Sequence, residues 1–219
     1  EYVSKTNLLI MNKKVVAIIQ ARTTSSRLPG KVLRPILNKP MIIFQLERIR
    51  QTKGINKVIL ATSTQKSDDA LAEIVESYGF NVFRGSLSDV LFRFYSCSKN
   101  EKAEIVIRIT GDCPFTDPEL IDEMLFEFHK SNWDYLSNCQ DENNLSVPDG
   151  FDIEIFKANL LEKANSHASL PSEREHVTPW FITKEANINW SHYIHKKKYK
   201  YFRVTVDEEK DLEVVRNIA

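Results

Sequence analysis

The chain has 219 residues, 42% hydrophobic and 27% charged, which is typical of a globular protein with a substantial core. Its 30 basic and 30 acidic residues cancel, so composition favours neither a nucleic-acid coat nor a membrane-surface protein. No apolar run approaches the roughly 20 residues that a membrane span needs. We therefore expect any anionic ligand to be bound by a local cluster of basic residues.

The cysteines and the amino-terminal segment bear on compartment and domain organisation. Cys97, Cys113 and Cys139 are odd in number and widely spaced, which argues against a disulfide framework or structural zinc and for a reducing cytoplasm. Met11 followed by Asn-Lys-Lys resembles a natural start. We expect residues 1–10 to be an extension, a linker or an expression remnant, and residues 11–219 to form a single domain.

Strand-like and helix-like segments alternate through the first two thirds of the chain. Short apolar runs predict strands, and apolar residues at helical spacing predict helices. The strands are expected at 15–20, 58–62, 81–85 and 104–109, and the helices at 41–51, 67–78, 88–98 and 117–130. Ser67 is expected to cap its helix, and Gly79 to end it in the left-handed conformation. Such alternation predicts parallel βαβ units with right-handed crossovers.

After residue 131 the pattern changes to shorter segments. Strands are expected at 134–137, 151–156, 190–194 and 201–206, helices at 160–167 and 173–184, and a closing helix from Asp207. A polar loop is expected at 140–148. Together these segments predict one α/β domain with a smaller antiparallel excursion late in the chain.

The most informative segment, QARTTSSRLPGKVL at 20–33, follows the first predicted strand. A loop at the carboxyl end of a parallel strand is where open α/β sheets bind ligands. Arg22, Arg27 and Lys31, a run of four hydroxyl side chains and free backbone N–H groups suit a polyphosphate. The alternative is a solvated basic loop.

Two aspartates also follow predicted strands. Asp112, in Gly-Asp-Cys-Pro, offers hard carboxylate oxygens suited to Mg²⁺, and Gly111 beside it would let the backbone approach a ligand closely. Asp112 could instead serve only in a turn. Asp207 closes one predicted segment and opens another, so helix capping is its simplest alternative.

Further polar residues could contact a substrate. Asp152 and Glu154 lie two apart and so share one face of a strand, where they could bind a cation or hydroxyl groups, or form the wet face of an edge strand. Arg174 or His176, at a predicted helix start, could meet an anionic group or merely be solvated. The chain has no Gly-x-Gly-x-x-Gly, Walker or nucleophile-elbow motif, which disfavours dinucleotide oxidoreductases, P-loop ATPases and α/β-hydrolases.

Five motifs resemble those of the spore-coat polysaccharide biosynthesis protein F family, which is similar to the cytidylyltransferases that make CMP-sugars. They are QARTTSSRLPGKVL, ITGDCPFTDPELID, PDGFDIEIF, LPSEREHVTP and VTVDEEKDLE, in order from about Val15 to the end. The resemblance implies a Rossmann-like, three-layer α/β/α nucleotidyltransferase of the glycosyltransferase-A type, with a mostly parallel central sheet. The loop reads Thr-Thr-Ser-Ser where the family is expected to have Met-Gly-Ser-Thr.

The resemblance also implies a reaction: CMP passes from CTP to an acidic sugar or a sugar or polyol phosphate, and pyrophosphate leaves. It further implies surface polysaccharide or glycan biosynthesis, a Mg²⁺ cofactor and a homodimer. The implied catalytic residues are Arg22, Lys31, Asp112 and Asp207, the last two holding Mg²⁺. The implied nucleotide-binding residues are Gln20, Ala21, Arg22, Ser25, Ser26, Arg27, Lys31, Thr62 and Asp112. The implied sugar-side residues are Asp149, Asp152, Glu154, Arg174 and His176.

Two other functions are compatible with the same pattern. A glycosyltransferase with a nucleotide-sugar donor usually holds its metal with an Asp-x-Asp pair, whereas Gly111-Asp112-Cys113 offers one carboxylate. A non-catalytic nucleotide-binding module is the other, and charged residues at several strand ends argue against it.

Overall fold

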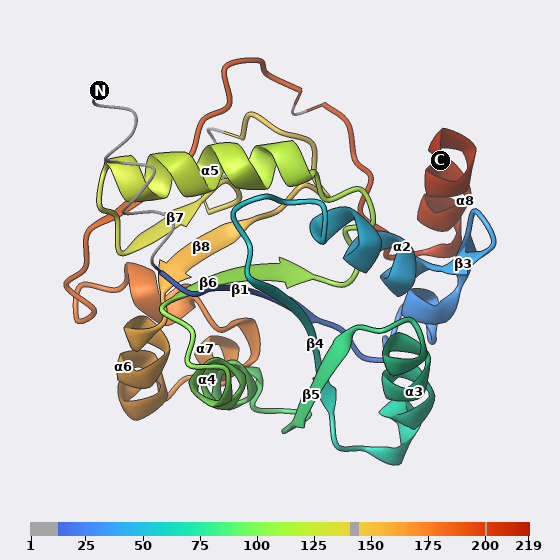
Figure 1. Cartoon of the computed structure of the whole chain (residues 1–219), viewed down its shortest axis with the longest axis horizontal. Helices are drawn as coiled ribbons and strands as arrows, with labels where there is room; N and C mark the ends of the chain where they lie inside the picture. Colours follow the sequence, from blue (N-terminus) through green and yellow to red (C-terminus); the bar gives the residue numbers. More distant parts are fainter. Residues whose placement is uncertain (1–12, 141–144, 200) are drawn as a thin grey trace.

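The computed structural model describes residues 13–140, 145–199 and 201–219. Within these ranges, a seven-stranded sheet has the order β5-β4-β1-β6-β8-β7-β9 (Figure 1). Only β8 runs antiparallel to its neighbours in this sheet, β6 and β7, while the remaining pairs are parallel. The strands are β1 (Val15–Gln20), β4 (Lys57–Ser63), β5 (Asn81–Gly85), β6 (Ile105–Thr110), β7 (Tyr135–Ser137), β8 (Glu154–Lys157) and β9 (Trp190–His192). A separate antiparallel pair joins β2 (Pro35–Ile36) and β3 (Lys39–Pro40).

Helices cover both faces of this sheet. They are α2 (Met41–Ile49), α3 (Asp69–Ser77), α4 (Val90–Asn100), α5 (Pro118–Lys130), α6 (Asn159–His167), α7 (Pro171–His176) and α8 (Glu209–Ile218), with 3₁₀ turns η1 (Lys31–Leu33), η2 (Lys66–Asp68) and η4 (Pro179–Ile182). None of the helices in the described ranges is long and apolar enough to cross a membrane.

Two hydrophobic cores lie on opposite faces of the sheet, because successive side chains of a strand point to opposite sides. Val15, Ala17 and Ile19 of β1 pack with α2, α3, α5 and α8. Val16 and Ile18 pack with α4, α6 and η4. Figure 1 shows α5 above the sheet and α4 and α6 below it. The predicted α/β class, with a mostly parallel sheet and a small antiparallel excursion, is confirmed.

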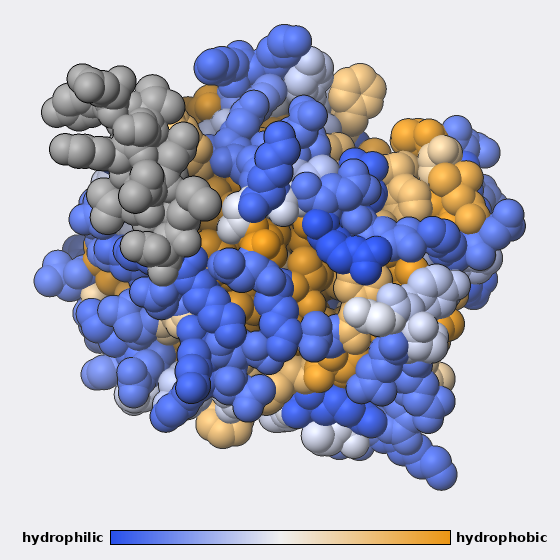
Figure 2. Space-filling model, in the orientation of Figure 1, coloured by the Kyte–Doolittle hydropathy of each residue, from blue (hydrophilic) through white to orange (hydrophobic). Residues whose placement is uncertain are grey.

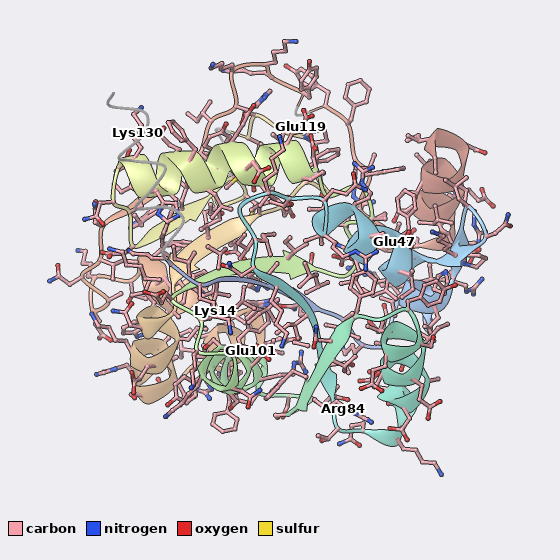
Figure 3. All side chains as sticks on the ribbon, viewed as in Figure 1. Lys14, Glu47, Arg84, Glu101, Glu119 and Lys130 are labelled. Atoms are coloured by element: carbon pink, nitrogen blue, oxygen red, sulfur yellow. The ribbon has the colours of Figure 1, made fainter. Side chains whose placement is uncertain are left out.

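Charged side chains form the surface around these cores. Figure 2 shows a mostly hydrophilic face, with hydrophobic residues visible in recesses near its centre and in exposed patches toward the upper right. At the amino-terminal edge of the sheet, Glu101 pairs with Lys57 at 2.8 Å and lies near Lys14 (Figure 3). Arg84, at the end of β5, pairs with Asp69 at 2.6 Å. The basic residues at these edges are thus neutralised locally.

The early elements lie where the sequence predicts them, with boundary shifts of two residues at most. The prediction that Gly79 ends its helix in the left-handed conformation is confirmed, with φ 77°. The predicted helix start at Asp117 is also confirmed, and the Asp117 side chain accepts a hydrogen bond from the Glu119 N–H there. The prediction that Ser67 caps a helix is wrong. Ser67 lies within η2, and the residue before α3 is Asp68.

Three late predictions are also wrong. The helix predicted at 173–184 ends at His176, because Val177 has φ 72°, outside the helical region, and residues 179–182 form the separate 3₁₀ turn η4. The strand predicted at 151–156 begins only at Glu154. Instead of a strand, residues 201–206 form an isolated bridge, between Arg203 and Asp149, and Tyr201 lies in a turn. The expectations for residues 1–10 and 141–144 lie outside the described residues.

Gly111 fixes the end of β6 against the end of β1. Its N–H donates to the Gln20 carbonyl at 2.8 Å, and a Cβ at this position would lie 2.7 Å from the Ala21 Cβ. The close approach expected of this glycine is therefore made by the loop after β1. Gly111 thus holds the loop after β1 directly beside Asp112.

We expect Gly111→Ala to lower the free energy of unfolding by roughly 1–3 kcal/mol, because overpacking forces the two strand ends apart. Urea denaturation would measure the change. Glu76→Ala, on the exposed face of α3, is the control and should change stability by less than about 0.5 kcal/mol. Equal stability of Gly111→Ala and the wild type would contradict the close packing.

Candidate active site

A cavity of about 330 Å³ opens at the carboxyl ends of β1 and β6. Its floor comes from these two strands, its rim from the loop after β1, and its walls from α4 and α7. The lining residues are Gln20, Ala21, Arg22, Ser25, Ser26, Arg27, Lys31, Val32, Leu87, Val90, Arg93, Arg108, Thr110, Gly111, Asp112, Glu175, His176 and Asp207. A site at this edge of a parallel sheet is where the topology favours ligand binding.

Lys31 is the centre of a buried charged cluster in this cavity. Its Nζ donates to the Val206 carbonyl at 2.6 Å, to Asp207 Oδ1 at 3.0 Å and to Asp112 Oδ2 at 3.3 Å. Gly30 sets the turn before η1 with φ 71° and donates its N–H to the Thr23 carbonyl at 2.8 Å. The loop thus turns back and places the lysine between two carboxylates from distant parts of the chain.

Asp207 also binds two arginines. Its Oδ1 accepts from Arg27 at 2.8 Å, and its Oδ2 accepts from Arg203 at 2.8 Å. Arg203 in turn binds Asp149 at 2.9 Å and Asp211 at 2.6 Å. The extended segment before α8 therefore joins the cavity through ion pairs rather than through a strand ladder.

Asp112 is held in its ionised form. Burial opposes ionisation, but Lys31 and the Thr110 hydroxyl outweigh it and hold the pKa of Asp112 below its usual value. Its Oδ2 pairs with Lys31, whereas its Oδ1 lies 3.6 Å from the Cys113 thiol and forms no ion pair among the described residues. One oxygen of this anionic carboxylate is therefore available to a ligand.

Asp68 anchors the loop from below. This fully buried residue accepts from the Thr23 N–H and hydroxyl, each at 2.8 Å, and from the Ser63 hydroxyl. Burial opposes its ionisation, yet these hydrogen bonds hold the pKa of Asp68 below its usual value. The sequence did not predict this role, although its signal was an aspartate soon after a buried strand, like that of Asp112.

A second buried cluster lies in the floor. Glu154 is 3% exposed and forms an ion pair with Arg108, and it accepts from the Tyr135 hydroxyl at 2.6 Å and the Thr178 hydroxyl at 2.7 Å. Arg108 also donates to Gln20 Oε1 at 3.0 Å. The alternative that Glu154 forms the wet face of an edge strand is wrong, because β8 lies between β6 and β7.

A profile of the cytidylyltransferase family matches residues 16–216. The chain belongs to this family. The spore coat polysaccharide biosynthesis protein SpsF of Bacillus subtilis is 34% identical over 92% of this chain and 85% of its own length. A cytidylyltransferase structure from Leptospira borgpetersenii has 35% identity and a TM-score of 0.86, covering 94% of this chain and 86% of its own. The family inferred from the five motifs is confirmed.

More distant structures show the same fold. A structure of CMP:2-keto-3-deoxy-manno-octonic acid synthetase complexed with CTP has a TM-score of 0.72 at 21% identity, covering 94% of this chain and 98% of its own. The predicted nucleotidyltransferase fold is therefore confirmed for this cytidylyltransferase.

In the structure of this chain, most of the predicted nucleotide-side residues line the cavity, whereas most of the predicted sugar-side residues do not. Those that line the cavity are Gln20, Ala21, Arg22, Ser25, Ser26, Arg27, Lys31, Asp112, His176 and Asp207. Those absent from its lining are Thr62, Asp149, Asp152, Glu154 and Arg174. Arg174 pairs with Asp89 and donates to Asn165 Oδ1 at 2.9 Å, which bridges α7 to α4 and α6. The sequence did not single out two arginines of the lining, Arg93 and Arg108.

Asp112 and Asp207 are the residues that fit a divalent cation. No group of three or more His, Cys, Asp or Glu side chains in the described ranges could hold one. The two carboxylates nevertheless bind one ammonium group between them, and Mg²⁺ usually completes its shell with waters and substrate phosphates. Arg27, whose side chain is 62% exposed, would have to release Asp207 Oδ1. The donor set fits a hard cation that arrives with a phosphorylated substrate.

Asp152 lies near these carboxylates and carries a pH-dependent charge. Burial first, and then Asp149, Glu154 and Asp112, raise its pKa to about 7. When the pKa of a carboxyl group is higher in the folded protein than in the unfolded chain, the protein loses stability as the pH rises from the unfolded pKa to the folded pKa. In metal-free protein we expect Asp152→Asn to become increasingly stabilising from about pH 4 to pH 7, reaching roughly 1–3 kcal/mol. Urea denaturation across this range would measure it.

Asp134→Asn is the matched control, because Lys157 and the Asn189 N–H outweigh burial and lower the pKa of Asp134. Because its pKa is lowered, the Asp134 carboxylate stabilises the folded protein at pH values above its unfolded pKa. Asp134→Asn loses this contribution and should be less stable than the wild type at neutral pH. A stability difference for Asp152→Asn that does not change with pH would contradict the raised pKa.

Proposed function

We propose that this cytidylyltransferase transfers CMP from CTP to an acidic sugar or a phosphorylated sugar or polyol, releases pyrophosphate, and serves surface polysaccharide or glycan biosynthesis. The observation that carries the proposal is the convergence of Lys31, Asp112 and Asp207 in a cavity rimmed by Arg22 and Arg27. Such a site offers both fixed positive charge and carboxylates for a cation. Both are needed to bind a triphosphate.

The loop after β1 is proposed to hold the phosphates. Arg22 and Arg27 are exposed and can turn toward a ligand, whereas Lys31 is buried and fixed. Ser25 and Ser26 line the same rim. In the reaction the acceptor oxygen attacks the α-phosphorus while the bond to the pyrophosphate oxygen breaks. Positioning and charge neutralisation then supply most of the rate enhancement.

Mg²⁺ is proposed as the cofactor, held by Asp112 and Asp207. When bound, it would neutralise negative charge on the phosphate oxygens. A manganese complex has been described for a mycobacterial structure of the same fold, at 12% identity and a TM-score of 0.65. The work of this chain's own residues is to hold the Asp112 carboxylate ionised and to orient it beside Asp207, and Lys31 contributes to both through its hydrogen bonds to the two side chains.

The acceptor is proposed to enter beside α7, where His176 and Glu175 line the cavity. An acidic sugar is favoured by the relatives. The 3-deoxy-manno-octulosonate cytidylyltransferase of Geobacter metallireducens is 34% identical over 51% of this chain and 43% of its own length. Of the predicted sugar-side residues, His176 is therefore retained, and Asp149, Asp152 and Arg174 could act only from outside the cavity lining.

A homodimer and a cytoplasmic location complete the proposal. The exposed hydrophobic side chains of Ile194, Tyr199 and Phe202, on the segment after β9, support a subunit contact. Sedimentation equilibrium would test the dimer. The free thiols of Cys97, Cys113 and Cys139 support a reducing compartment.

A pyrophosphate-release assay tests the function. Each of the four nucleotides would be combined with a panel of sugar acids, sugar phosphates and polyol phosphates. We expect release that depends on CTP, on one class of acceptor and on a divalent cation. Release of a nucleoside diphosphate from a nucleotide-sugar donor would indicate a glycosyltransferase instead. CTP binding without turnover across the panel would indicate a non-catalytic module.

A further inference from the structure

Four arginines line the cavity, and their charges are neutralised unequally. Arg27 pairs with Asp207, and Arg108 pairs with Glu154. Arg22 and Arg93 form no ion pair with any residue in the described ranges. Arg22 is exposed, so water can solvate its unpaired charge. An unpaired charge on a buried side chain is costly.

Arg93 is such a buried side chain. It lies on α4 and is 3% exposed. Its Nη1 donates to the Ser86 carbonyl at 2.7 Å, while its Nε is buried without a hydrogen-bond partner among the described residues. Gly85 leaves room for its stem, because a Cβ there would lie 2.9 Å from Arg93 Cγ. The fold thus accommodates a guanidinium at the cavity wall without satisfying it.

The two acidic residues whose charges act on Arg93 are bound to other groups. Asp68 and Asp89 favour the charged form of Arg93 from a distance. Asp68 is bound to Thr23 and Ser63, and Asp89 pairs with Arg174. Burial lowers the pKa of Arg93 to about 10, and repulsion from Arg22 acts in the same direction. At neutral pH the side chain therefore remains charged, buried and without a counter-ion.

We propose that Arg93 is a phosphate-binding residue of this site, which with Arg22 binds one phosphoryl group of the nucleotide. The inference rests on the proposed function for the identity of the ligand. Arg22 belongs to the loop proposed to hold the triphosphate, and it lies close enough to repel Arg93. A phosphoryl group between them would relieve the repulsion, and a guanidinium can donate two parallel hydrogen bonds to its oxygens.

Isothermal titration calorimetry with CTP and with cytidine tests the proposal without requiring turnover. We expect Arg93→Met to weaken CTP binding by about 10- to 100-fold, the range for a lost hydrogen bond to a charged group, and to leave cytidine binding unchanged. Arg50→Met, an exposed arginine that stacks on Phe80, removes the same charge outside the cavity and should change neither affinity.

Unchanged CTP binding, or equal losses for CTP and cytidine, would overturn the proposal. Arg93→Lys keeps the positive charge but loses the planar guanidinium, so its CTP affinity should lie between those of the wild type and Arg93→Met. If Arg93→Met does not fold, a folded Arg93→Lys protein with wild-type CTP affinity overturns the proposal instead. A wild type that binds CTP but never releases pyrophosphate would refute the proposed function and leave this inference standing, whereas a wild type that does not bind CTP refutes both.

Discussion

Asp112→Asn is expected to lower turnover by at least ~100-fold while the fold stays intact, the scale seen when one group that stabilises transition-state charge is lost. The asparagine keeps the shape of the side chain but removes its negative charge. Asp112 is the carboxylate of the site with one oxygen outside any ion pair among the described residues, since Lys31 binds Oδ2 and the Cys113 thiol lies 3.6 Å from Oδ1. The loss should therefore fall on catalysis rather than on packing.

Pyrophosphate release at saturating CTP measures this effect, and thermal unfolding shows whether the fold is kept. Asp117→Asn is the matched control, because the same substitution five residues later affects only a helix cap, and asparagine caps about as well as aspartate. Its turnover should equal that of the wild type. Near wild-type release by Asp112→Asn would refute the assignment of Asp112 to the metal.

The fold could be predicted where local pattern is sufficient. Strands β1 and β6 are β-branched runs buried on both faces, and α4 and α5 begin at aspartates that cap them. The failures lie late in the chain, where structure depends on distant partners. The segment at 201–206 has strand-like composition, but its backbone bonds are made to Asp149 and to the Asp112 carbonyl, which no local pattern reveals.

The site could be predicted in part for a related reason. Lys31 and Asp112 follow strands that are neighbours in a parallel sheet, so their meeting follows from topology. Arg93 and Arg108 were missed in the sequence analysis because each lies inside a helix or strand that the apolar residues around it are sufficient to predict. The signal was present in both cases, because a charged residue occupies a position on the buried face of a helix or a strand.

Lys31→Met is expected to cost both activity and stability. Methionine keeps the length of the side chain but leaves Asp112 and Asp207 facing each other without the ammonium group between them. Breaking a buried pair by removing one partner leaves an uncompensated charge, so in metal-free protein at pH 7 the free energy of unfolding should fall by about 3 kcal/mol. Turnover should fall at least ~100-fold, because a fixed phosphate contact is lost.

The same geometry predicts what restores the stability of Lys31→Met. Without Lys31 the burial of Asp112 is no longer outweighed, so the folded pKa of Asp112 should rise above its unfolded value and the deficit should shrink as the pH is lowered toward 5. Adding Mg²⁺ should reduce it at pH 7, because a cation can take the position between the carboxylates. Lys39→Met, which breaks a partly exposed pair with Glu47 far from the two aspartates in sequence, should lose at most about 1 kcal/mol and gain nothing from Mg²⁺. A Lys31→Met deficit that neither acid nor Mg²⁺ reduces would mean that packing, not charge, is what Lys31 provides.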